Sequence, residues 1–165
     1  MDDTAPRAAR PEDADHIADL HVRAWAETYA DLLPAPELAR NSLAARRTLW
    51  RAVLVAPSTR VAVLPGAGFA CMGPQRDTAR SADHPEEPLA LYVLRTHHGR
   101  GIGRALLGSV RDPASFTAWV LSGNARALAF YRRSGGHEIG RRSEILDGMD
   151  LTEILISFPT PPDGA

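Results

Sequence analysis

Apolar side chains recur at helical spacing near the start of this 165-residue chain, which indicates helices with one buried face. Pro11-Glu12-Asp13 is a typical helix start, and Ile17, Leu20, Ala24, Trp25 and Thr28 follow it at that spacing. After a loop at residues 31–34, a second helix is expected from Pro36 to about Ala56. Its apolar side consists of Leu38, Leu43, Leu49, Trp50, Val53 and Leu54.

Short apolar runs between turn residues predict strands in the middle of the chain. Residues 60–64 and 69–72 flank Pro65-Gly66-Ala67-Gly68 and are expected to form a β-hairpin. A weaker strand is expected at residues 6–10, and the polar stretch 73–88 is expected to be a loop.

From residue 89 onward, strands and helices alternate. We expect a strand at 89–94, a loop with a helix to about residue 111, a strand at 117–121 and a helix at 124–134. A final hairpin is expected to turn at Asp147-Gly148, and Ile154-Leu155-Ile156 indicates a well-buried last strand. This order predicts a mixed α/β sheet with helices on both faces.

Length and composition fit one domain that is large enough to bury a core. The sequence is 44% hydrophobic and 24% charged, and its formal net charge is -1. We expect a single domain over residues 5–158, with flexible tails at 1–4 and 159–165 that are rich in Pro, Gly and Asp.

The charge balance and the cysteine count limit the classes of partner. No run of basic residues favours nucleic acid or a membrane surface, so neither is expected as a partner. The single cysteine, Cys71, excludes an internal disulfide and a Cys-rich zinc site, and its apolar neighbours predict a buried packing thiol. His84, His97 and His98 lack metal-site spacing, so no metal is expected. No signal peptide or membrane-spanning run is recognised, and the expected location is the cytoplasm.

An Arg- and Gly-rich segment follows the strand at 89–94 and opens the next helix: His98-Gly99-Arg100-Gly101-Ile102-Gly103-Arg104. Its glycines permit backbone φ values closed to other residues and leave main-chain N–H groups free. These donors converge at the positive end of the helix dipole, where a phosphate or pyrophosphate is favoured, and Arg100 and Arg104 add charge. The segment predicts an anion site, with a glycine turn that serves only close packing as the alternative.

Two familiar phosphate-binding loops do not fit this segment. The chain contains no lysine, so the cation of a P-loop is missing. The glycine fingerprint of a dinucleotide fold follows the first strand, whereas this loop lies past the middle of the chain.

A second pattern covers the strand and helix over residues 119–135. Asn124 is well placed to cap the helix through its side chain, and its amide could also face a ligand. Ala127 and Tyr131 lie three and seven residues later and project from nearly the same helix face. Gly135 is expected to end the helix.

The order strand, glycine loop, helix, strand and Asn-x-x-Ala-x-x-Phe-Tyr-x-x-x-Gly resembles the GNAT superfamily of acetyl-CoA-dependent N-acetyltransferases, over about residues 7–158. The loop pattern of that family, Gln/Arg-x-x-Gly-x-Gly/Ala, is matched by His98, Gly101 and Gly103, with His98 in the place of Gln or Arg. The resemblance implies a GNAT-like mixed, mostly antiparallel, twisted sheet of about six to seven strands. It also implies acetyl-CoA as co-substrate and an amine acceptor, and it allows a homodimer because relatives often pair.

By the same resemblance, the backbone of the strand at 89–94 contacts the pantetheine arm of the coenzyme and the glycine loop holds its pyrophosphate. The residues implied in coenzyme binding are Leu91, Tyr92, Val93, His98, Gly99, Arg100, Gly101, Ile102, Gly103, Arg104 and Asn124.

Tyr131 matches the general acid of the family. The unperturbed pKa of a phenol is about 10 and that of a thiol about 8.5, so Tyr131 is a neutral phenol at pH 7 and is expected to donate its proton as the thiolate departs. A packed aromatic side chain is the alternative. Glu87 is the candidate base, directly or through water, with a solvated loop carboxylate as the alternative. Trp25 and Tyr29 are candidates for the acceptor pocket, with core packing as the alternative.

We therefore expect an N-acetyltransferase that moves an acetyl group from acetyl-CoA to a primary amine of a small molecule or peptide, by direct attack in a ternary complex. A non-catalytic module that binds or senses acyl-CoA is the alternative. A generic nucleotide-binding protein is a third and weaker hypothesis.

Overall fold

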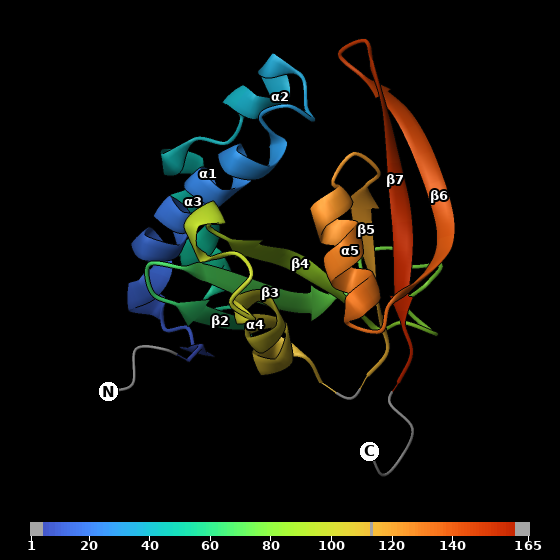
Figure 1. The fold of residues 1–165 in the computed structure, drawn as a ribbon. Coiled ribbons are helices and arrows are strands. Elements are labelled where there is room, and N and C mark those ends of the chain that lie inside the picture. The colour runs from blue at the N-terminus through green and yellow to red at the C-terminus, as the bar shows by residue number, and fades with distance from the viewer. Residues whose placement is uncertain (1–4, 113, 161–165) are drawn as a thin grey trace.

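Seven strands form one sheet in the order β1-β2-β3-β4-β5-β7-β6 (Figure 1), in a computed structural model that describes residues 5–112 and 114–160. All neighbouring strands are antiparallel except β4 and β5, so the predicted mixed and mostly antiparallel sheet is confirmed. The expected tail at 1–4 and all but residues 159 and 160 of the other tail lie outside the described residues. The strands are β1 (Arg7–Ala8), β2 (Arg60–Leu64), β3 (Gly68–Pro74), β4 (Glu86–Val93), β5 (Phe116–Leu121), β6 (His137–Leu146) and β7 (Met149–Phe158).

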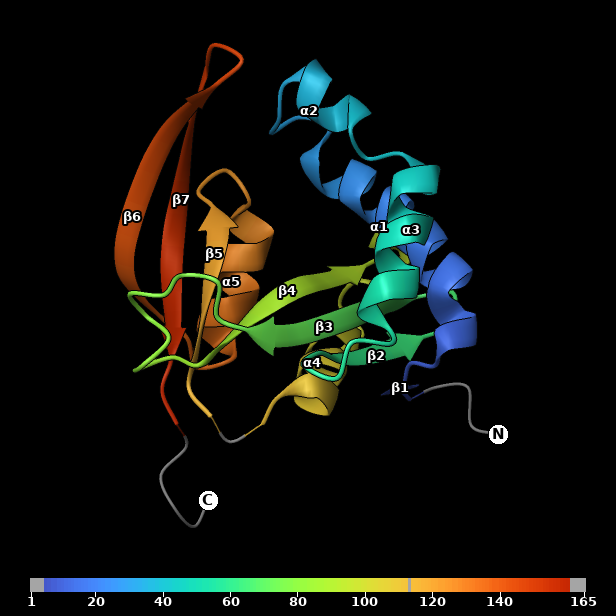
Figure 2. The ribbon, with the colours of Figure 1, turned by 180° about the vertical axis from the view of Figure 1, so that it is seen from behind.

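Helices cover both faces of the sheet, as predicted (Figures 1 and 2). A short 3-10 turn (Pro11–Asp13) leads into α1 (Ala14–Tyr29), which packs with α3 (Leu43–Val53) on one face. On the other face lie α4 (Ile102–Val110) and α5 (Ala125–Arg133). A second 3-10 turn, Arg95–His97, follows β4.

Two hydrophobic clusters fill the space between the sheet and its two helical layers. Successive residues of a strand point to opposite faces, so Val63 and Phe69 pack against α1 and α3, whereas Ala62 and Ala70 pack against α4. Cys71 is buried in the first cluster, where burial raises its pKa to about 11, and the predicted packing thiol is confirmed.

The expected continuous helix from Pro36 to about Ala56 is wrong. The structure has a short α2 (Ala35–Ala39) and a separate α3, with a break at residues 40–42. Ser42 caps α3 by accepting a hydrogen bond from the Ala45 N–H (3.2 Å), and the Asn41 side chain donates to the Val22 carbonyl oxygen (3.1 Å). Polar side chains that bond to the backbone end one helix and start the next.

Strand boundaries differ from the prediction at two places. The strand expected at 6–10 is reduced to Arg7–Ala8, and the loop expected at 73–88 is shorter because β3 continues to Pro74 and β4 begins at Glu86. The hairpins at 60–74 and at 137–158 are confirmed, including the turn at 147–148.

Strands β4 and β5 separate after one residue pair, Glu86 with Phe116. Both strands continue for several residues beyond that pair, so their facing edges diverge and leave part of the β4 backbone without a sheet partner. This divergence positions the functional site.

Candidate active site

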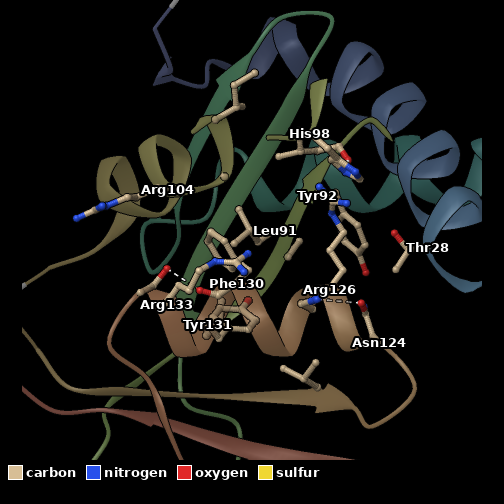
Figure 3. A pocket seen from close by; sticks show the side chains of 18 of the residues that line it. Thr28, Leu91, Tyr92, His98, Arg104, Asn124, Arg126, Phe130, Tyr131 and Arg133 are labelled. Atoms are coloured by element: carbon tan, nitrogen blue, oxygen red, sulfur yellow. Dashed lines mark hydrogen bonds between the residues drawn. The ribbon is translucent and has the colours of Figure 1, made fainter. Parts of the chain in front are cut away.

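A cavity of about 820 Å³ opens where β4 and β5 diverge (Figure 3). Its volume falls in the range that small-molecule sites occupy. Residues from six regions line it: the end of α1, the loop between β3 and β4, the strand β4, the segment 97–104, the helix α5 with its cap, and the strands β5, β6 and β7.

The β4 backbone turns polar groups toward this cavity. The Leu94 N–H donates to the Ala67 carbonyl oxygen (2.8 Å), and because hydrogen-bonded pairs alternate along an antiparallel ladder, the backbone groups of Leu91 and Val93 point away from β3. The His98 ring donates from Nε2 to the Val93 carbonyl oxygen (2.7 Å), whereas His98 Nδ1 is buried without a hydrogen-bond partner among the described residues.

The glycine loop has the left-handed backbone that the sequence predicted. Gly99 and Gly101 both have φ of 77°, a conformation that other residues rarely adopt, and Gly101 is the N-cap of α4. The first N–H groups of α4 have no partner within the helix and lie at the positive end of its dipole. Arg104 lines the cavity, but Arg100 does not.

Tyr131 lies on α5, lines the cavity and is 8% exposed. Its ring packs edge-on against Phe130 and Phe158, and burial raises the pKa of Tyr131 well above its ordinary value. The predicted helix cap is confirmed, because Asn124 Oδ1 accepts a hydrogen bond from the Ala127 N–H (3.0 Å). Gly135, with φ of 94°, follows the end of α5 as predicted.

All three tyrosines of the chain line this one cavity: Tyr29, Tyr92 and Tyr131. Burial raises the pKa of each of them. The cavity therefore presents three phenols that are neutral at physiological pH.

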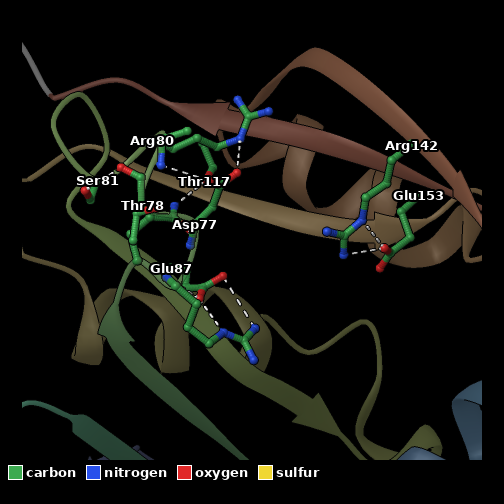
Figure 4. A network of polar contacts seen from close by, with 11 residues as sticks. Asp77, Thr78, Arg80, Ser81, Glu87, Thr117, Arg142 and Glu153 are labelled. Atoms are coloured by element: carbon green, nitrogen blue, oxygen red, sulfur yellow. Dashed lines mark hydrogen bonds and ion pairs between the residues drawn. The ribbon is translucent and has the colours of Figure 1, made fainter.

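Glu87 lies inside β4 and is 5% exposed, so the alternative of a solvated loop carboxylate is wrong. Arg76 holds it: the Arg76 N–H donates to Glu87 Oε1 (2.9 Å) and the guanidinium forms an ion pair with the same carboxylate (Figure 4). Arg76 lines the cavity, whereas Glu87 does not.

The two aromatic residues predicted for an acceptor pocket do not line the same cavity. Tyr29 lines the main cavity, but Trp25 lines a separate hollow of about 180 Å³ between α1 and the chain at Leu38 and Asn41. The two rings are in contact, with centroids 5.0 Å apart, so Trp25 supports Tyr29 from behind.

Several cavity residues were not predicted from the sequence, and they come from elements far apart in the chain. Arg142 and Glu153 form an ion pair across β6 and β7, and Trp119 of β5 lies beside them. Alternation along the last hairpin could have placed Arg142 and Glu153 on one face, but nothing in the sequence brings that face to the glycine loop. Further polar lining residues that were not predicted include Thr28, Arg76, Arg126 and Arg133.

Within residues 5–112 and 114–160, no group of three or more His, Cys, Asp or Glu side chains could hold a metal ion. Among the same residues, no helix has the length and the apolar character needed to cross a membrane.

Comparison with known proteins identifies the family. A family model described as an acetyltransferase (GNAT) domain matches residues 45–135, which is more than half of the chain. The chain belongs to the GNAT family of acetyltransferases, and the acyltransferase class predicted from the sequence is confirmed.

Individual relatives agree with this assignment. The chain is 27% identical over 164 residues to the uncharacterized N-acetyltransferase YuaI of Bacillus subtilis (strain 168), covering 93% of this chain and 91% of that protein. Among solved structures, the fold matches yncA from Salmonella typhimurium, determined with its cofactor acetyl-CoA, at a TM-score of 0.69 and 19% identity over 98% of this chain and 96% of that one. It also matches Arabidopsis thaliana NAA60, in complex with a bisubstrate analogue, at a TM-score of 0.66 and 16% identity over 93% and 96%.

Proposed function

We propose that this protein transfers the acetyl group of acetyl-CoA to a primary amine of a small molecule or peptide, by direct attack in a ternary complex. The observation that carries the proposal is the cavity between the diverging strands β4 and β5, with a left-handed glycine loop at one end and a buried tyrosine in its wall. Family membership supports the reaction class, and the geometry of the cavity supports the role proposed for each group.

The coenzyme lies with its pyrophosphate on the first turn of α4. Main-chain N–H groups of residues 101–104 neutralise it together with the helix dipole and Arg104. Its pantetheine arm runs along β4, where the backbone groups of Leu91 and Val93 face the gap. A β4 N–H polarises the thioester carbonyl, because a fixed donor stabilises the negative charge that develops on the oxygen.

Tyr131 donates the proton that the leaving thiolate requires. Its raised pKa keeps the phenol protonated at neutral pH, so its hydroxyl can donate a hydrogen bond to the sulfur and pass on its proton as negative charge develops there. Glu87 remains the base predicted from the sequence, but the Arg76 ion pair limits it to action through water or after that pair opens.

Thiol release in the presence of amines tests the proposal. Purified protein with acetyl-CoA and a panel of primary amines should release free CoA only when both substrates are present. Tight binding of acetyl-CoA without turnover of any amine would support the non-catalytic module instead.

Cytoplasmic location, the absence of nucleic-acid and membrane partners, and a homodimer remain predictions of the sequence. Size-exclusion chromatography with light scattering measures the last of these directly.

A further inference from the structure

The lining of the cavity includes an ion pair that the proposed reaction has not yet used. Arg142 of β6 and Glu153 of β7 are direct cross-strand partners, and Arg142 Nε and Nη2 each lie 2.6 Å from Glu153 Oε2 (Figure 4). Their side chains are 57% and 21% exposed, and both line the cavity. The pair is fixed by the ladder and accessible to a ligand.

Trp119 holds the guanidinium in place. The Arg142 guanidinium carbon lies 4.2 Å from the centroid of the Trp119 ring, within the range of a cation–π interaction. Leu121 pairs with Glu153, so Trp119 is the diagonal neighbour of Glu153 on the same face of the sheet. Ala118 and Val120 belong to the hydrophobic cluster between the sheet and the helices α4 and α5. Because side chains alternate along a strand, Trp119 and the ion pair lie on the opposite face, which α5 does not cover.

The side chains that line the cavity carry more positive than negative charge. Arg104, Arg126 and Arg133 form no ion pair with any described residue, which suits a polyphosphate. Glu153 is the only carboxylate among the described lining residues, and Arg76 is neutralised by the buried Glu87 behind it. A polycationic acceptor would find no surplus negative charge there, whereas a ligand with one charge of each sign would be matched.

We propose that Arg142 and Glu153, backed by Trp119, bind the head group of an acceptor that carries an amino group beside a carboxylate, as an α-amino acid does. Glu153 binds the ammonium of the acceptor and Arg142 binds its carboxylate. Each of the four charged groups then has neighbours of opposite charge. The inference rests on the proposed acetyl transfer and names the acceptor class for it.

Glu153 then also takes part in the chemistry, as the base in place of Glu87, because Glu153 lines the cavity and Glu87 does not. The bound ammonium loses one proton to the Glu153 carboxylate, and the neutral nitrogen attacks the thioester carbonyl, forming a carbon–nitrogen bond. As the carbon–sulfur bond breaks, the thiolate takes a proton from Tyr131, and the second proton of the nitrogen restores the phenol through water. Acetylated amine and free CoA leave, and the proton on Glu153 passes to solvent, so one proton is released per turnover.

Kinetics with matched acceptors test the assignment. The twenty common amino acids, their amides and the corresponding decarboxylated amines are compared as acceptors at saturating acetyl-CoA. For the acceptors that react, we expect kcat/KM to fall by about tenfold or more when the carboxylate is removed, since a charge-assisted hydrogen bond is lost. Amides or simple amines that react as well as the amino acids, or no reaction with any amino acid, would overturn the proposal.

Two variants assign the residues. Arg142→Gln should raise KM for the amino acids and bring the ratio between amino acid and amide toward one, with affinity for acetyl-CoA unchanged. Glu153→Gln should lower kcat/KM for both acceptor types. Glu144→Gln is the matched control, because Glu144 is an exposed carboxylate of the same hairpin that does not line the cavity. An unchanged acceptor ratio in Arg142→Gln contradicts the assignment.

The two levels of the account fail separately. If acetyl-CoA does not bind, the proposed function fails. If acetyl-CoA binds and amines without a carboxylate are preferred, only the acceptor class is wrong.

Discussion

Gly103 of α4 lies directly against the ring of Phe130 of α5: a Cβ at Gly103 would come within 3.2 Å of Phe130 Cε2. The third glycine of the loop therefore serves close packing, whereas Gly99 and Gly101 serve the left-handed backbone. This contact joins the helix that opens at the glycine loop to the helix that carries Tyr131, so the two motifs predicted separately are in direct contact.

Gly103→Ala tests this contact. The added methyl group should push Phe130 aside and lower kcat/KM, while the free energy of unfolding changes by less than about 1 kcal/mol because the helix propensity of alanine offsets the crowding. Phe130→Leu in the same chain should restore part of the lost activity. Equal effects of Gly103→Ala in both backgrounds would show that the two residues are not coupled.

Tyr131→Phe removes the phenol and keeps the ring. We expect kcat to fall by about 10²-fold or more, the range of general acid catalysis, while calorimetry gives an unchanged affinity for acetyl-CoA. Because the pKa of Tyr131 is raised, wild-type activity should not decline through loss of its proton between pH 7 and pH 10. An undiminished kcat in the variant would remove the acid role.

Buried His21 should make stability depend on pH. The Trp50 Nε1–H donates to His21 Nδ1 (3.1 Å), and burial lowers the pKa of His21 to about 3. The unfolded chain takes up a proton near pH 6.5 and the folded chain does not, so stability is fully present above that pH and is lost as pH falls toward 3. Between pH 7 and pH 5 the free energy of unfolding should decrease by about 2 kcal/mol from this residue.

Urea unfolding at the two pH values measures this dependence. The Gln side chain of His21→Gln can accept the hydrogen bond of Trp50 but does not titrate. The free energy of unfolding of this variant should therefore decrease less between pH 7 and pH 5. Asp13, whose pKa is lowered to about 2 mainly by its hydrogen bonds with Arg7, titrates below this window and is not expected to contribute. An equal decrease in the variant would contradict the assignment.

Removal of Arg76 should destabilise the protein more than neutralisation of Glu87. Arg76→Ala leaves a buried carboxylate without its cation, whereas Glu87→Gln removes the charge and leaves Arg76, which is 75% exposed, in water. We expect the free energy of unfolding, measured with urea, to fall by about 1–3 kcal/mol for Arg76→Ala and by less for Glu87→Gln.

The same Glu87→Gln variant also tests which carboxylate acts as the base. A larger fall in kcat for Glu87→Gln than for Glu153→Gln would show that Glu87, and not Glu153, is the base.

The elements that local sequence encodes were predictable. Glycine at alternate positions before a helix, an asparagine cap and turn residues between apolar runs act within a few residues, and the loop at 98–104, the cap at Asn124 and both hairpins follow from them.

The features that could not be predicted depend on contacts between distant segments. The break between α2 and α3 depends on Asn41 reaching the Val22 carbonyl oxygen, and the neutral His21 depends on Trp50. The sequence did not indicate that Glu87 is buried, because its burial depends on the pairing of β3 with β4 and on Arg76. Pairing between β5, β7 and β6 likewise brings Trp119, Glu153 and Arg142 together.

The most direct test of the central claim is titration calorimetry of acetyl-CoA with the wild type, Gly101→Ala and Gly108→Ala. Gly101 has φ of 77°, where a side chain is strained by about 1–2 kcal/mol, whereas Gly108 lies in α4 with open space at its Cβ position. We predict binding to the wild type and to Gly108→Ala with equal affinity, and affinity lowered by about tenfold in Gly101→Ala. No heat of binding to the wild type, or equal affinities for all three proteins, would contradict a pyrophosphate site on this loop.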